Sequence, residues 1–106
     1  MGSMSPASTA IVVKVDPEIA DMVPRFLANR ARDVRALRDA IARSDLEAAR
    51  STGHILKGVG GGYGFAAISE LGERIESAAL EGQSGAIASA VEELAEFLAR
   101  VRVEVE

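Results

Sequence analysis

The sequence predicts an all-α fold, specifically an antiparallel up-down four-helix bundle with a short extra N-terminal helix. Apolar residues recur three and four positions apart over most of the chain, which is the spacing of an amphipathic helix. The breaks between these periodic segments are short, which favours antiparallel neighbours. With 106 residues the chain is long enough for one domain with one modest core.

The two ends of the chain are expected to differ from the bundle. Met1-Gly2-Ser3-Met4 looks like an expression remnant, so we assign residues 1–9 to that remnant and a disordered N-terminus, and residues 10–106 to the domain. Residues 10–15 are β-branched and predict a strand or an extended arm. Residues 101–106 alternate with period two, so they could form a strand instead of helix and pair with the first segment.

Helix ends are indicated by local signals. Asp16 and Pro17 predict the start of the short extra helix, because aspartate caps helix N-termini and proline suits the first helical position. Pro24 should end or kink that helix, since proline lacks the N–H donor. The helices of the bundle are then expected at about residues 23–43, 46–63, 65–81 and 87–101.

Composition excludes several classes of function. The chain has no cysteine and one histidine, so we expect no disulfide, no metal site and no bound cofactor. A net charge of −4 argues against a nucleic-acid partner. The absence of cysteine suits the cytoplasm, where we expect the protein to be. No apolar run is long enough to span a bilayer, so we expect no membrane partner. Cations dominate the first half of the chain, either as a solvated helix face or as a patch for an acidic partner.

The single histidine, His54, is expected on the outer face of its helix. On a helical wheel the residues within about 60° of His54 are Glu47, Arg50, Lys57, Gly58 and Gly61. The opposite side carries the stripe that should face the bundle, made of Ala49, Thr52, Leu56, Val59 and Tyr63. This placement argues against a core histidine and leaves two alternatives, an idle surface histidine or a functional one.

Glycines crowd the helix that follows His54, at positions 58, 60, 61, 62 and 64. Each glycine inside a helix costs about 1 kcal/mol relative to alanine. One explanation is a flexible loop, and the other is a helix side kept bare so that another protein can approach His54. The run is not a nucleotide loop, because no strand precedes the G-x-G-x-x-A match at residues 62–67.

The residue types around His54 suit phosphoryl chemistry. A neutral imidazole has one nitrogen free to attack phosphorus. Arg50 and Lys57, about one turn on either side, would balance the charge of a transferred phosphoryl group.

The pattern His54-x-x-Lys57-Gly58, followed by Gly61, Tyr63, Gly64-Phe65 and Ile68, resembles the histidine phosphotransfer (HPt) family. It is most similar to the domain that opens chemotaxis histidine kinases, and the helical pattern from about Pro17 to Val101 agrees with that architecture. The resemblance implies that His54 is the phosphoacceptor, that Lys57 lies near the phosphoryl oxygens, that Gly58 admits a receiver domain and that Gly64 makes the turn into the next helix.

The resemblance also implies a role for one residue of the helix that follows the histidine helix. Glu76 falls where chemotaxis-type domains carry a glutamate that hydrogen-bonds and orients the histidine; the alternative is an exposed acid beside Arg74. Glu73 departs from the family, because a second histidine is frequent there, and Gly53 replaces a common alanine, which looks like a minor change. Ile55 after the histidine, with no later proline, disfavours the dimerisation helices of an autokinase.

The resemblance implies a phosphorelay intermediate and not a free-standing enzyme. His54 would accept a phosphoryl group from the aspartate of a receiver domain, which brings its own Mg²⁺ and docks over Gly58 and Gly61, and would pass the group to another receiver. The expected partners are response-regulator receiver domains and a hybrid or chemotaxis-type histidine kinase. Two alternatives remain: a detached substrate domain of a chemotaxis-type kinase, and a helical adaptor that is never phosphorylated.

Overall fold

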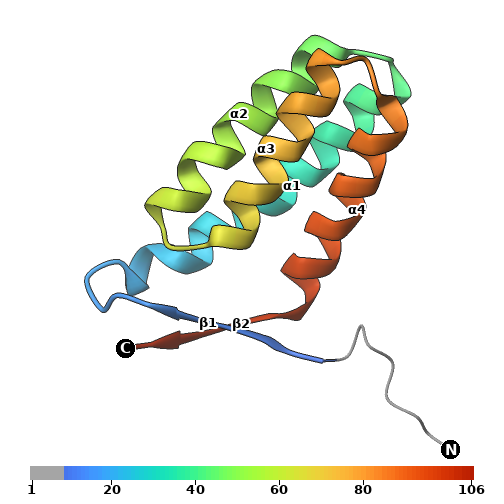
Figure 1. The fold of residues 1–106 in the computed structure, drawn as a ribbon. Coiled ribbons are helices and arrows are strands. Elements are labelled where there is room, and N and C mark those ends of the chain that lie inside the picture. Colours follow the sequence, from blue (N-terminus) through green and yellow to red (C-terminus); the bar gives the residue numbers. More distant parts are fainter. Residues whose placement is uncertain (1–8) are drawn as a thin grey trace, which may run out of the picture.

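The structure, a computed structural model, describes residues 9–106 and contains four long helices packed side by side, with a pair of strands across one end (Figure 1). The expected remnant and disordered segment at residues 1–9 lies outside the described residues except for Thr9. The elements in chain order are β1 (Ile11–Val15), η2 (Ala20–Met22), α1 (Val23–Ala42), α2 (Leu46–Gly62), α3 (Ala66–Leu80), α4 (Ser84–Arg100) and β2 (Val101–Val105). The prediction of four helices is therefore confirmed.

The extra N-terminal helix expected from Asp16 is not confirmed, because the chain between β1 and α1 is helical only over three residues. The Asp16 carboxylate accepts a hydrogen bond from the backbone N–H of Glu18 at 2.7 Å, and the chain continues through turns to a single 3₁₀ turn at Ala20–Met22. Helix α1 then begins at Val23 with Pro24 in its first turn, where the missing N–H has no intrahelical partner to lose. Pro24 thus marks the beginning of a helix, and the expectation that it ends one was wrong.

The two valine-rich ends form a parallel strand pair, so the fold is not strictly all-α. Ile11 lies opposite Val101 and Val15 opposite Val105. Parallel strands need a long crossover connection, and here the whole bundle supplies it (Figure 1). In β1 burial alternates along the strand and is complete at Val15, so one face of the pair packs against the bundle.

The core is formed by the apolar stripes of all four helices. Its largest fully buried side chains are Leu37, Leu56, Phe65, Ile68, Ile75, Ile87, Val91 and Leu94. The Phe26 ring stacks on Tyr63 with centroids 4.3 Å apart and on Phe65 at 5.2 Å, which joins α1 to the end of α2. Of the stripe expected on α2, Ala49 and Leu56 are buried and the other members are partly buried.

Local signals fix both ends of α2. The Asp45 carboxylate caps the helix by accepting a hydrogen bond from the Ala48 N–H at 3.0 Å. At the other end Gly64 has φ of 82°, a conformation that glycine adopts without a steric penalty, and the chain turns there into α3. The contacts of α2 with α3 run in opposite directions along the chain, from Gly53 beside Glu76 to Gly60 beside Ser69, so these two helices are antiparallel.

Candidate functional site

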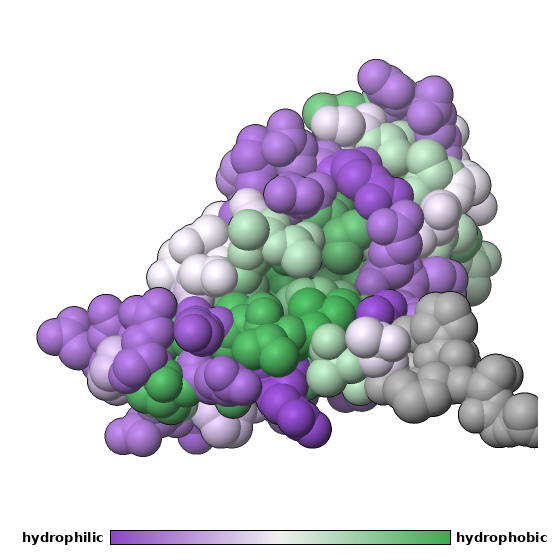
Figure 2. All heavy atoms as spheres, turned by 60° about the horizontal axis from the view of Figure 1, so that its bottom comes forward, coloured by the Kyte–Doolittle hydropathy of each residue, from purple (hydrophilic) through white to green (hydrophobic). Residues whose placement is uncertain are grey.

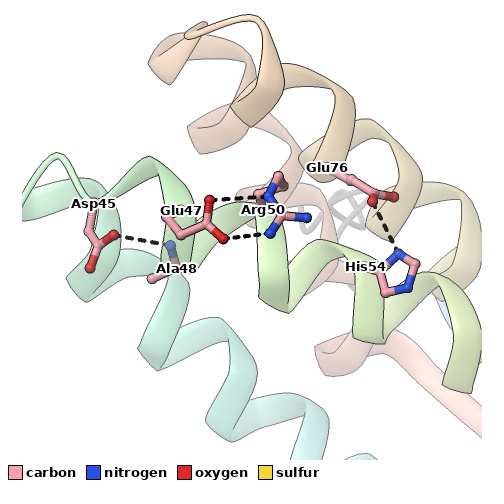
Figure 3. A network of polar contacts seen from close by, with 6 residues as sticks. All are labelled: Asp45, Glu47, Ala48, Arg50, His54 and Glu76. Atoms are coloured by element: carbon pink, nitrogen blue, oxygen red, sulfur yellow. Dashed lines mark hydrogen bonds and ion pairs between the residues drawn. The ribbon is translucent and has the colours of Figure 1, made fainter.

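His54 lies on the outer face of α2, with its side chain 69% exposed. Its Nδ1 is 3.1 Å from Oε2 of Glu76 on α3, and the two side chains point toward each other (Figure 3). An ionised carboxylate only accepts hydrogen bonds, so Nδ1 carries the proton and donates a hydrogen bond to Glu76. The other ring nitrogen, Nε2, is left with its lone pair available on an exposed ring.

Glu76 is held where it can act on the histidine. Its side chain is only 18% exposed, although the side chain of His54, which it contacts, is largely exposed. Arg74, which offered the alternative explanation of Glu76 as an acid beside a cation, instead binds Glu93 on α4 at 2.7 Å and 2.9 Å. Glu76 is therefore paired with the histidine and not with Arg74.

Three glycines bring α2 and α3 close enough for this contact. A Cβ on Gly53 would lie 2.7 Å from the backbone N of Glu76, and one on Gly60 would lie 2.6 Å from the backbone N of Ser69. A Cβ on Gly72, from the α3 side, would lie 2.7 Å from the carbonyl O of Gly53. Real Cβ atoms do not approach backbone atoms this closely, so these positions require glycine.

Sequence reasoning missed this role. Gly53 appeared to be a minor change from alanine, and Gly60 was grouped with the other glycines. The available signal was the seven-residue spacing of Gly53 and Gly60, which places both on the side of α2 between the exposed face and the apolar stripe.

The remaining glycines of α2 leave the surface near His54 bare. A Cβ on Gly58 would meet nothing within 4 Å, and a Cβ on Gly61 would only reach Ser69 Oγ at 3.9 Å. Both residues are exposed and belong to α2, as does Gly62, which is equally open. The flexible-loop explanation is wrong, because this segment is helical as far as Gly62.

The two cations expected near His54 differ in what they contact. Arg50 is bound to Glu47, one turn back along α2, through Nη2 to Oε2 at 2.5 Å and Nε to Oε1 at 3.3 Å (Figure 3). The hydrogen bond and charge of Arg50 hold the pKa of Glu47 below its usual value, and Glu47 in turn raises the pKa of Arg50. Lys57 is exposed and has no carboxylate within ion-pairing distance among residues 9–106.

Other kinds of site find little support in the described part of the chain. Within residues 9–106 no three histidine, cysteine, aspartate or glutamate side chains gather as metal ligands would. None of the helices described has both the length and the apolar character needed to cross a membrane. Glu73 is exposed on α3, so the position where related domains often have a second histidine carries a solvated acid.

The fold and the site define a class of protein: a small helical domain that presents one imidazole on a helix face, oriented by a carboxylate from the next helix. The model of the Hpt domain family matches residues 21–104, so the chain belongs to the Hpt domain family, whose members have a histidine phosphotransfer role in phosphorelays. No curated protein and no solved structure matches the chain significantly.

Proposed function

We propose that this protein is a phosphorelay intermediate that accepts a phosphoryl group on Nε2 of His54 from a receiver-domain aspartate and passes it to a second receiver. The observation that carries the proposal is the 3.1 Å contact between His54 Nδ1 and Glu76 on an imidazole that is otherwise exposed. Because the Nδ1 proton is held by Glu76, the lone pair of Nε2 faces the incoming partner.

The proposed transfer is a single displacement. The Nε2 lone pair attacks phosphorus, the bond from phosphorus to the aspartate oxygen breaks, and the aspartate leaves as a carboxylate. The imidazolium that results keeps its Nδ1 proton, and its positive charge is stabilised by Glu76. The Mg²⁺ belongs to the receiver, and the protein itself needs no cofactor and no catalytic activity of its own, since it supplies mainly position and charge.

Access to His54 supports a protein as the phosphoryl donor. Gly58 and Gly61 leave the helix backbone uncovered beside the histidine, and Ile55 next to it is 53% exposed. A helix surface without side chains beside the histidine lets another domain approach closely, and an exposed isoleucine offers that domain an apolar contact. We infer that receiver domains dock here, and that a hybrid or chemotaxis-type histidine kinase supplies the phosphoryl group upstream.

A transfer assay tests the proposal. The purified protein is mixed with a panel of receiver domains carrying a radiolabelled phosphoryl group, and separately with the catalytic domain of a chemotaxis-type kinase and ATP. We expect label to move from at least one receiver to the protein, and the adduct to survive base and be lost in acid, as a phosphoramidate does. Labelling by the kinase alone would favour the detached substrate domain. Partner binding without any labelling, unchanged by His54→Ala, would favour the adaptor and overturn the proposal.

Lys57→Ala should slow transfer more than Arg50→Ala. Lys57 has no ion-pair partner in the described structure and can contact the phosphoryl oxygens directly, whereas Arg50 would first have to leave Glu47. A lost charge-assisted hydrogen bond is worth roughly 1.5–3 kcal/mol, so we expect a rate about ten- to a hundredfold lower for Lys57→Ala. Single-turnover transfer rates measure this, with Lys14→Ala on β1 as the matched lysine control. A larger effect of Arg50→Ala would reverse the roles assigned to the two cations.

Gly58→Gln should separate docking from folding. Gly58 is helical and its missing Cβ faces open space, so glutamine should raise the stability by about 0.5–1 kcal/mol through helix propensity and a less flexible unfolded chain. The same side chain should obstruct an approaching receiver and slow transfer. Melting curves and transfer rates are compared with those of Gly85→Gln, an equally open helical position on α4. A stable Gly58→Gln variant with undiminished transfer would mean that the partner does not approach over this face.

A further inference from the structure

The strand pair β1–β2 leaves backbone hydrogen-bonding groups unused. It is a sheet of two parallel strands, and both of its outer edges are unpaired within residues 9–106. Parallel strands are normally found inside larger sheets with both faces covered. Here hydrophobic residues gather along the strand pair between hydrophilic ones (Figure 2), and Val12 and Val105 are 50% and 57% exposed.

The hydrogen bonds between β2 and β1 show which backbone N–H and C=O groups of β2 point to its unpaired edge, called the open edge below. The N–H of Glu106 donates to the carbonyl of Val15 at 2.9 Å, and Val15 lies opposite Val105. In a parallel ladder this places the bonds to β1 on every second residue of β2, namely the even-numbered ones. The N–H and C=O groups of Val101, Val103 and Val105 therefore point away from β1, to the open edge.

We propose that the open edge of β2 binds β2 of a second copy of this chain, antiparallel and centred on Val103, so that the two strand pairs join into one four-stranded sheet. A twofold symmetric contact of this kind pairs each residue with its mate on the other copy. In this register Val103 faces Val103 of the partner subunit, and Val101 faces Val105 of the partner subunit. These are the residues whose backbone groups point outward, so every such pair can exchange two hydrogen bonds.

Charge complementarity selects this partner and this register. Between the hydrogen-bonded pairs, Arg102 lies opposite Glu104 of the partner subunit, and by symmetry the pair occurs twice. Both side chains are exposed, and neither has an ion-pair partner within the described residues. Because Glu104 also lies opposite Lys14 of β1, the solvent face of the joined sheet would carry alternating charges across three strands.

Other pairings of the same strands are less favourable. A register centred on Val105 would place Glu104 opposite Glu106 of the partner subunit, with like charges facing each other. A slip by one residue would set the outward N–H and C=O groups of one copy against even-numbered residues of the other, whose groups already face β1. Self-pairing through β1 about Val13 would set Lys14 against Val12, with no complementary charge, and an edge lysine disfavours pairing.

The test is the mass of the full chain in solution as a function of concentration, by sedimentation velocity or light scattering. We expect a concentration-dependent dimer. Arg102→Glu places a carboxylate opposite a carboxylate in both of the pairs that Arg102 and Glu104 form between the copies. Glu104→Arg places a guanidinium group opposite a guanidinium group in the same two pairs. Each variant alone should therefore dimerise at least about tenfold more weakly than the natural sequence. Mixed together, the two variants should form a heterodimer, because both of these pairs between the copies then join opposite charges.

A backbone variant provides an independent check. Val103→Pro removes an N–H that faces the open edge and spares the even-numbered residues that bond to β1, so it should yield a monomer with unchanged helical circular dichroism. A natural chain that stays monomeric up to several hundred micromolar would overturn the proposal. So would a dimer that survives Val103→Pro, or one indifferent to both charge changes, since the interface would then lie elsewhere. Phosphoryl uptake by His54 is measured separately and does not depend on the outcome.

Discussion

His54→Gln is expected to abolish phosphoryl uptake and to leave the domain folded. The side chain is 69% exposed and its one polar contact is with Glu76, so its removal opens no cavity in the core. Glutamine is a good helix former, and exposed substitutions of this kind usually change stability by less than about 0.5 kcal/mol. Its amide nitrogen has no available lone pair, and His54 is the only histidine in the sequence.

The measurement is label transferred from a phosphorylated receiver to the variant, beside its thermal melt. Glu76→Gln is the matched control, because it removes the carboxylate charge and keeps a side chain of the same size. We expect this control to take up label slowly but completely, since Glu76 positions the imidazole and does not accept the phosphoryl group. Label retained on His54→Gln, or an adduct that survives acid, would place the phosphoryl group on serine or threonine instead.

Much of this site was predictable because its determinants are local. Asp45 lies in the break between α1 and α2 and caps the N-terminus of α2. Gly64 has a positive φ after the other end of α2, a conformation that favours glycine. Between these two points the phase of α2 is fixed by its apolar stripe. His54 therefore had to lie on the outer face, and the wheel could place Lys57 and Gly58 on its side without any knowledge of the other helices.

The errors concern contacts between segments far apart in the chain. Asp16 and Pro17 are typical of a helix start. The segment before them, however, pairs with β2 at the opposite end of the sequence. The chain after Asp16 therefore forms turns that lead from β1 into α1 in place of the expected helix. The alternation of residues 101–106 indicated a strand that could pair with the first segment, but it did not show that this pairing would replace the helix start at Asp16 with turns. The proline in the first turn of α1 was misinterpreted for the same reason, since Pro24 can begin one helix or end another with the same φ.

The glycines of α2 show the same limit more sharply. Gly58 and Gly60 are two residues apart in one helix and are equivalent by composition and propensity. The first faces open space and the second lies against the backbone of α3. The helical phase places Gly60 nearer the apolar stripe than Gly58, but only the position of α3 shows that its backbone lies against Gly60.

Gly60→Ala and Gly58→Ala are therefore expected to shift stability in opposite directions. Alanine at Gly58 should stabilise by about 0.5–1 kcal/mol. At Gly60 the new Cβ would lie 2.6 Å from the backbone N of Ser69 and 3.0 Å from its Cα, so α3 has to move. Overpacking of this kind costs about 1–3 kcal/mol, which exceeds the gain in helix propensity. In thermal melts of a domain this size, each kcal/mol corresponds to roughly 4–8 °C.

Displacement of α3 should also reach the site, and Gly72→Ala tests this from the other helix. Its new Cβ would lie 2.7 Å from the carbonyl O of Gly53 and 2.8 Å from Cβ of Leu56, both on α2. Relief of these contacts separates the two helices and carries Glu76 away from His54, so Gly72→Ala should slow transfer as Glu76→Gln does.

If Gly72→Ala and Glu76→Gln both act through the contact of Glu76 with His54, the double variant should transfer hardly more slowly than either single variant. Two changes that weaken the same contact do not have additive effects. Fully additive losses would show that Gly72→Ala acts on transfer by a route other than Glu76. Stabilisation by Gly60→Ala, comparable to that by Gly58→Ala, would mean that α2 and α3 do not approach each other closely enough to require glycine.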